Sequence, residues 1–104
     1  MSMADIQLES SSNKPKQPKP TFSVPQEEVS RNPSDYTTTE HFVVRKQERG
    51  ITGRQIRETI ESGSIDYGKK DNYFEFEHND IRIIVDITEP TQNNVAVTVM
   101  RVYE

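Results

Sequence analysis

Three residues in the middle of the chain, His41, Arg45 and Arg49, follow one another at intervals of four. If this stretch is a helix, residues four apart are neighbours on its surface, so their side chains form one stripe. Histidine changes its protonation near neutral pH, with an ordinary pKa of about 6.5. Arginine binds phosphate oxygens in a bidentate manner. The spacing therefore predicts a stripe that can hold a phosphate group and move a proton beside it.

The stripe lies in a locally basic stretch of an acidic protein. The chain of 104 residues has a formal net charge of -4. A local basic face can attract anions to one place without promoting general binding to nucleic acid. A second interpretation stays open, because a charged run is often only the solvated face of a helix. Residues 41–57 contain a single acidic residue, Glu48, and five basic ones: Arg45, Lys46, Arg49, Arg54 and Arg57.

The composition of the chain changes near residue 35. Residues 1–35 include a serine tract and alternating lysine and proline, and few large apolar side chains. Such a segment cannot bury enough surface to offset its ordering entropy, so we expect a disordered arm. Residues 21–29, within it, could instead fold onto a partner. From Tyr36 onward apolar residues are dense and periodic, which predicts one compact domain over residues 36–104.

The first half of this domain carries the signals of two helices. A short edge strand over residues 35–40 leads into a helix that Thr39 can cap and that Gly50 should stop. Thr52 and Gln55 have the spacing of a capping box at the start of a second helix. Gly63 should end that helix.

The second half alternates between apolar and polar residues, as strands with one buried face do. We expect strands over residues 64–67, 73–78, 81–87 and 95–103, with a two-residue turn at Asn79 and Asp80. Val95, Val97 and Val99 should face the core. Helices followed by strands indicate an α+β fold, in which two helices pack on a four-stranded, mostly antiparallel sheet.

Several apolar residues fall on the outer face of this sheet. They are Ile84, Ala96, Met100 and Val102. Exposed apolar surface usually marks a contact, so we expect a cover such as the arm, a bound macromolecule or a second copy in a homodimer.

The composition also excludes several classes of site. The chain has no cysteine, which excludes disulfides and a cysteine nucleophile and fits a cytoplasmic protein. Its two histidines are far apart in the sequence, so no zinc site is expected. No glycine-rich phosphate loop is present, and no cofactor is expected. No stretch approaches the roughly 20 apolar residues of a membrane-spanning helix, so no membrane partner is expected.

The chain resembles a small domain-of-unknown-function family, number four-two-five-eight, over about residues 38–103. The resemblance rests on the run His41-x-x-x-Arg45-x-x-x-Arg49-Gly50-Ile51-Thr52, then Ile56, Ile60 and Gly63, then the strands ending in Val97, Thr98 and Val99. That family is similar in layout to RelE-like and BrnT-like toxin ribonucleases. The resemblance implies metal-independent RNA cleavage, with His41, Arg45, Arg49 and Thr98 lining one cleft. Arg101 and Tyr103, near the end of the last strand, match the pattern less closely.

This reaction assigns a role to each candidate residue. A base takes the 2′-hydroxyl proton, an acid protonates the leaving oxygen, and cations stabilise the phosphorane. His41 is the candidate base or acid, and Arg45 and Arg49 are the candidate phosphate ligands. Thr98 would donate a hydrogen bond, and Tyr103 would stack on a nucleobase or act as an acid. The alternative is a non-catalytic regulatory module whose basic face binds nucleic acid or an acidic, antitoxin-like protein.

Overall fold

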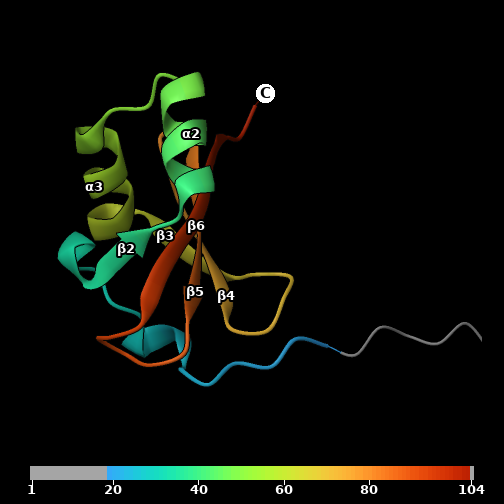
Figure 1. The fold of residues 1–104 in the computed structure, drawn as a ribbon. Helices are drawn as coiled ribbons and strands as arrows, with labels where there is room; N and C mark the ends of the chain where they lie inside the picture. Colours follow the sequence, from blue (N-terminus) through green and yellow to red (C-terminus); the bar gives the residue numbers. More distant parts are fainter. Residues whose placement is uncertain (1–18, 104) are drawn as a thin grey trace, which may run out of the picture.

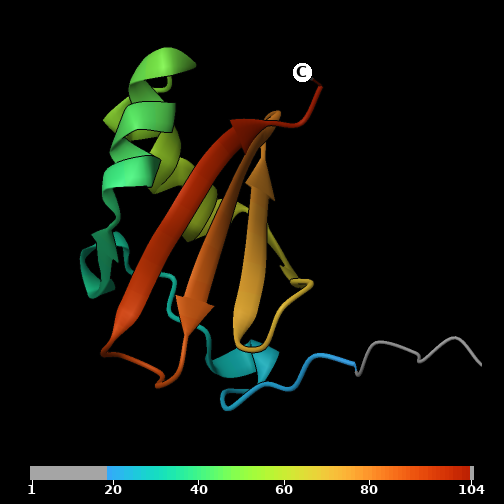
Figure 2. The ribbon, with the colours of Figure 1, turned by 45° about the vertical axis from the view of Figure 1, so that its right-hand side comes forward.

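The computed structural model describes residues 19–103, in which two helices pack against one twisted sheet (Figures 1 and 2). The predicted α+β class is confirmed, but the sheet has five strands where four were expected. Residues 1–18 of the expected arm lie outside the described residues. The elements are the 3-10 helices η2 (Gln26–Glu28) and η3 (Pro33–Asp35), strand β2 (Tyr36–Thr38), helices α2 (Glu40–Glu48) and α3 (Gly53–Ser62), and strands β3 (Ser64–Tyr67), β4 (Tyr73–His78), β5 (Ile81–Ile87) and β6 (Asn94–Arg101).

Helix α2 begins after Thr39 and is stopped at Gly50, as the sequence predicted. The Thr39 hydroxyl accepts the backbone N–H of Phe42 at 3.0 Å, which is the N-cap bond. Gly50 has a φ of 63°, a left-handed conformation that glycine adopts without a steric cost. The N–H groups of Gly50 and Ile51 donate back to carbonyls of the last turn at 3.2 and 3.0 Å, which is the Schellman pattern.

Helix α3 also has the predicted ends. The Thr52 hydroxyl accepts the N–H of Gln55 at 3.1 Å, and the Gln55 side chain accepts the N–H of Thr52 at 2.8 Å, so the capping box is confirmed. At the other end, a Cβ on Gly63 would lie 2.7 Å from the Glu77 carbonyl oxygen and closer still to that of Thr59. Glycine is therefore needed where the chain turns from α3 into the sheet. Within residues 19–103, neither helix is long and apolar enough to cross a membrane.

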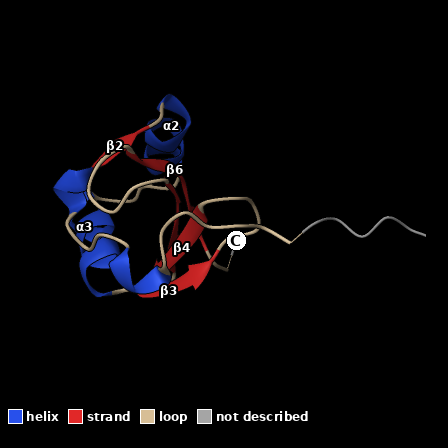
Figure 3. Cartoon of the chain, turned by 90° about the horizontal axis from the view of Figure 1, so that it is seen from below, coloured by secondary structure: helices blue, strands red, loops and turns tan. Residues whose placement is uncertain are grey.

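The sheet has the strand order β2-β6-β5-β4-β3. Strands β3 to β6 form the predicted antiparallel meander. The turn between β4 and β5 is confirmed at Asn79 and Asp80, whose φ values of 47° and 75° suit a tight hairpin. The fifth strand, β2, pairs in parallel with the first half of β6, up to Thr38 opposite Ala96. Figure 3 shows α3 on one face of the sheet and α2 beside β6.

Strand β6 departs from the predicted alternation. Val95 and Val97 were expected to face the core, but Ala96 between them is the buried residue. The partners of two consecutive β5 residues are Thr98 and Ala96, so Val97 is an extra residue, a β-bulge. After the bulge the alternation changes phase, and Val99 is buried as predicted.

The core lies between the helices and the inner face of the sheet. Strands β4 and β5 alternate as predicted, with Phe74 and Phe76 fully buried on the inner face. The helices contribute Phe42 and Ile60, and Ile51 packs from the turn between them. The remaining buried apolar residues are Val24, Val29, Ile81, Ile83, Val85, Ile87, Ala96 and Val99.

The segment of residues 21–35 belongs to the domain, so the expected boundary at residue 36 is moved toward the N-terminus. Val24 and Val29 are part of the core cluster, and the Phe22 ring lies 5.1 Å from that of Phe74. The Thr21 N–H donates to the Asp71 carboxylate at 2.9 Å. The density of apolar residues alone predicts a boundary at residue 36, but a few well-placed apolar residues are enough to anchor an irregular segment.

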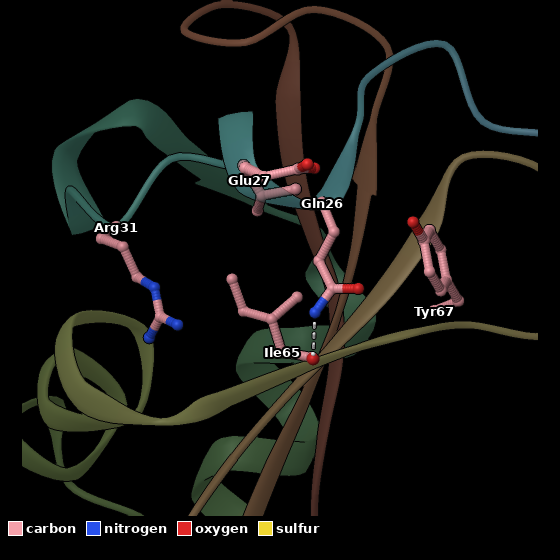
Figure 4. Close-up of a pocket in the computed structure, with 6 residues that line it drawn as sticks. Gln26, Glu27, Arg31, Ile65 and Tyr67 are labelled. Atoms are coloured by element: carbon pink, nitrogen blue, oxygen red, sulfur yellow. Dashed lines mark hydrogen bonds between the residues drawn. The ribbon is translucent and has the colours of Figure 1, made fainter.

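This segment also bonds to strand β3, beside the pocket drawn in Figure 4. The Gln26 amide donates to the Ile65 carbonyl at 2.7 Å, and the Arg31 guanidinium donates to the Gly63 carbonyl. Tyr36, at the start of β2, donates its hydroxyl to the Ser30 carbonyl at 2.7 Å. Burial, with a smaller contribution from nearby Asp35, raises the pKa of the Tyr36 hydroxyl well above its usual range.

We predict that Gly63→Ala lowers the free energy of unfolding by about 2–3 kcal/mol, because the added methyl group meets two backbone carbonyls. Gly53→Ala is the matched control, since nothing lies within 4 Å of a Cβ at this first position of α3. Its stability should stay unchanged or rise by up to about 1 kcal/mol. Urea denaturation measures both, and equal effects would contradict the close approach at Gly63.

We also predict that Val24→Ala lowers the free energy of unfolding by about 2 kcal/mol, because a fully buried side chain loses two methyl groups. The control is Val43→Ala on the surface of α2, where the side chain is 41% exposed and alanine favours the helix. Thermal and urea unfolding would measure the pair. An unchanged midpoint for Val24→Ala would show that residues 21–35 do not stabilise the domain.

Candidate functional site

Two adjoining pockets, of about 400 and about 390 Å³, lie beside α2 and on the sheet face opposite α3. We call them together the outer groove. Its upper part, between α2 and the C-terminal half of β6, is lined by His41, Arg45, Arg49, Thr98, Val99, Met100 and Arg101. Its lower part is lined by His41, Lys69, Lys70, Tyr73, Glu75, Arg82, Ile84, Val97, Thr98 and Met100. The two parts are neighbours, since His41, Thr98 and Met100 line both.

Helix α2 carries one wall of the outer groove, and its position follows from the shortness of β2. Because β2 pairs with β6 only as far as Ala96, the rest of that edge of β6 has no strand beside it, and α2 packs there (Figure 2). The Thr39 N–H donates to the Ala96 carbonyl at 3.2 Å, and its hydroxyl donates to the Val97 carbonyl at 2.8 Å. Because Phe42 is buried in the core, the neighbouring stripe of His41, Arg45 and Arg49 borders the groove.

The β-bulge at Val97 places Thr98 in the same groove. Ala96 faces the core, and without the extra residue a strict alternation would turn Thr98 inward as well. The bulge reverses the phase, so Thr98 lies on the outer face, opposite Ile84 of β5. The structure thus brings together four predicted site residues from two distant parts of the chain, namely His41, Arg45, Arg49 and Thr98.

The upper end of the outer groove is held by Arg101. Its guanidinium donates from Nε and Nη2 to the Arg49 carbonyl at 3.3 and 3.0 Å. This carbonyl is at the C-terminal end of α2, where the helix dipole favours a cation. Arg101 therefore ties the end of β6 to the end of α2 and fixes the two walls relative to each other.

Arg45 makes a second, weaker interaction. Its Nη1 lies 3.3 Å from the Glu48 carboxylate, and both side chains are largely solvated. Such exposed pairs are typically worth less than about 1 kcal/mol. The guanidinium has five N–H donors, so this ion pair leaves most of its donors available to an anion.

The far wall of the outer groove carries an acid, Glu75, for which no catalytic role was predicted. Glu75 lines the same pocket as His41, and its carboxylate lies 3.8 Å from Arg82 Nε. Arg82 makes its shorter contact, 3.0 Å, with Glu77. The alternation of β4 did place Glu75 on the outer face. Its alignment with Thr98 depends on the β4–β5 and β5–β6 registers, through Ile84.

An acid at the lower end of this face has a perturbed titration. Asp86 is the cross-strand neighbour of Tyr73, which lines the lower part of the groove. Burial raises the pKa of the Asp86 carboxyl, because it disfavours the ionised form. Asp86 itself does not line either pocket.

Several predicted residues lie away from the outer groove. Tyr103 follows β6 with 86% of its surface exposed and does not line either pocket. Arg54 and Arg57 belong to α3, which packs on the opposite face, and Arg54 pairs with Glu58 at 3.3 Å. Lys46 is on α2 but does not line the groove either. The basic stretch of the sequence is therefore divided between two sides of the molecule.

Comparison of the chain with protein-family models, with curated proteins and with solved structures found no match. The resemblance to family four-two-five-eight and to RelE-like toxins therefore stays a prediction, as do the expected partners. Within residues 19–103, no three His, Asp or Glu side chains are grouped so that they could hold a metal ion.

We predict that Arg101→Met lowers the free energy of unfolding by about 1 kcal/mol, because α2 loses a cation that bonds to its last turn. Methionine keeps an unbranched apolar stem. Arg54→Met is the control, since its side chain is 80% exposed and its ion pair lies on the surface. Guanidinium denaturation at constant ionic strength would compare them, and equal stabilities would show that the Arg101 bonds contribute nothing.

Proposed function

We propose that the protein cleaves RNA without a metal ion, in the outer groove, with His41 as the proton-transfer group. The observation that supports this most is the meeting of His41, Arg45, Arg49 and Thr98 around one cavity. The proposal includes kinship with the RelE-like toxin ribonucleases, whose motif these residues resemble. Phosphoryl chemistry on RNA needs cations and a titratable group around one phosphate, and this set supplies both.

The arginines of α2 would bind the scissile phosphate. Arg45 and Arg49 are one helical turn apart and line the same pocket as His41. A phosphate held between them would have its charge stabilised as it passes through the phosphorane, which carries more negative charge than the starting diester. The Thr98 hydroxyl, on the opposite wall, would donate a hydrogen bond to a non-bridging oxygen.

The proton transfers need one group that accepts and one that donates. In the proposed reaction the 2′-oxygen attacks phosphorus and loses its proton to Glu75, while protonated His41 gives a proton to the leaving 5′-oxygen. The P–O5′ bond breaks, and a 2′,3′-cyclic phosphate and a 5′-hydroxyl form. Glu75 and His41 approach the lower part of the groove from β4 and from α2, so they can act on opposite sides of one phosphate.

A second candidate function is RNA binding without cleavage. It is favoured by the exposure of His41, since catalytic sites usually exclude water from the proton-transfer group. In that case RNA affinity would fall with added salt, survive His41→Ala and be lost when both Arg45 and Arg49 are replaced by alanine.

We predict that the protein cleaves a labelled mixed RNA pool in EDTA and that His41→Ala reduces the rate at least about 100-fold, the usual contribution of general acid–base catalysis. His78→Ala is the matched control, because His78 lies at the end of β4, away from the outer groove. Its rate should equal that of the original chain.

The role of Glu75 is tested by Glu75→Gln, which keeps the shape of the side chain but cannot accept the proton. Its rate should also fall at least about 100-fold, because the 2′-hydroxyl then lacks its base. Folded, pure protein that cleaves no RNA, or equal rates for His41→Ala and His78→Ala, would contradict the catalytic proposal.

A further inference from the structure

The lower part of the outer groove has an apolar floor between charged ends. Ile84 of β5, Val97 at the bulge and Met100 of β6 are half-buried apolar side chains on this sheet face, and Tyr73 lines the same pocket. Lys69 and Lys70 lie in the loop before Tyr73, and the ammonium group of Lys70 is 5.7 Å from the centre of the Tyr73 ring. None of these residues is needed to hold the scissile phosphate.

The charges around this floor follow a defined order. Cations lie at the lower end, on the loop before β4, and at the upper end, on α2. Between them Glu75 projects from β4, in the same cross-strand row as Ile84 and Thr98, and Arg82 of β5 lies 3.8 Å from its carboxylate. With a carboxylate and a guanidinium side by side, the middle of the groove has no excess of positive charge to hold a further phosphate, and its apolar floor suits an uncharged group. From Tyr73 to Glu77 there are four steps along β4, roughly 13 Å at the usual rise of a strand.

We propose that the lower part of the outer groove is a subsite for an unpaired nucleobase of single-stranded RNA. The base lies over Ile84 and Val97 with Tyr73 at its edge or face, one flanking phosphate meets Lys69 and Lys70, and the other meets the arginines of α2. This inference rests on the proposed function, because the second phosphate is the one that would be cleaved. An apolar surface beside an aromatic ring, with cations at both ends, is complementary to a strand whose bases are splayed out.

The same order of groups disfavours two other occupants. A duplex keeps its bases stacked inside and presents only phosphates and sugars, so it cannot use the floor. An acidic protein segment meets the cations at the two ends, but its carboxylates cannot lie over the apolar floor of Ile84 and Val97 without a desolvation cost. The subsite therefore predicts preference for a single strand and a contribution from Tyr73 that does not depend on charge.

Binding of an uncleavable probe tests this inference separately from catalysis. The probe is a fluorescent RNA octamer of mixed sequence with 2′-O-methyl groups, used alone or annealed to its complement, and followed by fluorescence anisotropy. The single strand should bind about tenfold more tightly than the duplex. Tyr73→Leu, which keeps apolar bulk without the ring, should weaken the single strand about tenfold, in the usual range for one stacked base. Tyr103→Leu, the exposed tyrosine outside the groove, should change nothing.

The lysines give a second variant at exposed positions. Replacing both Lys69 and Lys70 by alanine should reduce the dependence of affinity on salt by about one phosphate contact. Lys46→Ala, a basic residue of α2 outside the groove, is the control. Circular dichroism would verify that each variant is folded.

Five outcomes are decisive. Preference for the single strand that is lost in Tyr73→Leu supports the subsite. If the same result is found in a protein that cleaves no RNA, the subsite still stands and only the catalytic proposal is contradicted. Equal affinity for the single strand and the duplex overturns the subsite. So does equal affinity of Tyr73→Leu and Tyr103→Leu, or the absence of binding to either probe.

Discussion

The outer groove depends on one contact, the attachment of the first turn of α2 to strand β6. The Thr39 hydroxyl caps α2 by accepting the Phe42 N–H and at the same time donates to the Val97 carbonyl. Each bond contributes only about 1 kcal/mol, so their importance is geometric. They fix the start of the helix at the β-bulge, and this sets which face of α2 meets which face of β6. A cap of another residue type without both functions would loosen the two walls at the start of α2, while Arg101 would still join them at its end.

The outer groove brings together residues that are far apart in the sequence, while some residues that are close in the sequence lie on different sides of the molecule. His41 and Thr98 are far apart in the chain and line the same cavity. Arg49 and Arg54 are close in the chain but lie on different sides, because the turn at Gly50 sends α3 to the inner face of the sheet. The net charge of a stretch of sequence is therefore a poor guide to the charge of a surface, while the spacing within a single helix is a good one.

The parts of the fold that could be predicted are those with local signals. The caps at Thr39 and Thr52, the stop at Gly50 and the hairpin at Asn79 each depend on a few adjacent residues, and all four are confirmed. The bulge at Val97 depends on the pairing with β5, and valines on both sides of it suggested a regular strand. The predicted role of Tyr103 assumed that β6 continues to the end of the chain, but the strand stops at Arg101. The alternation of β4 correctly predicted that Glu75 lies on the outer face. That it lines the same pocket as His41 depends on the strand registers, which the sequence does not show.

The N-terminal segment has a consequence for the behaviour of the protein in solution. Strand β3 is the last of the sheet. The carbonyl of Ile65 within it accepts a bond from the Gln26 side chain, and the carbonyl of Gly63 just before it accepts one from Arg31. An unoccupied edge strand is a template on which another chain can add a strand, and this is a common route to aggregation. Residues 26–31 therefore cover part of this edge and disfavour the addition of another strand, besides their contribution to the core. A shortened chain that begins at residue 36 would expose this edge and would also lose the bonds of Thr21 and Ser23 to the loop that carries Lys69 and Lys70, so one segment supports both the sheet edge and the lower part of the groove.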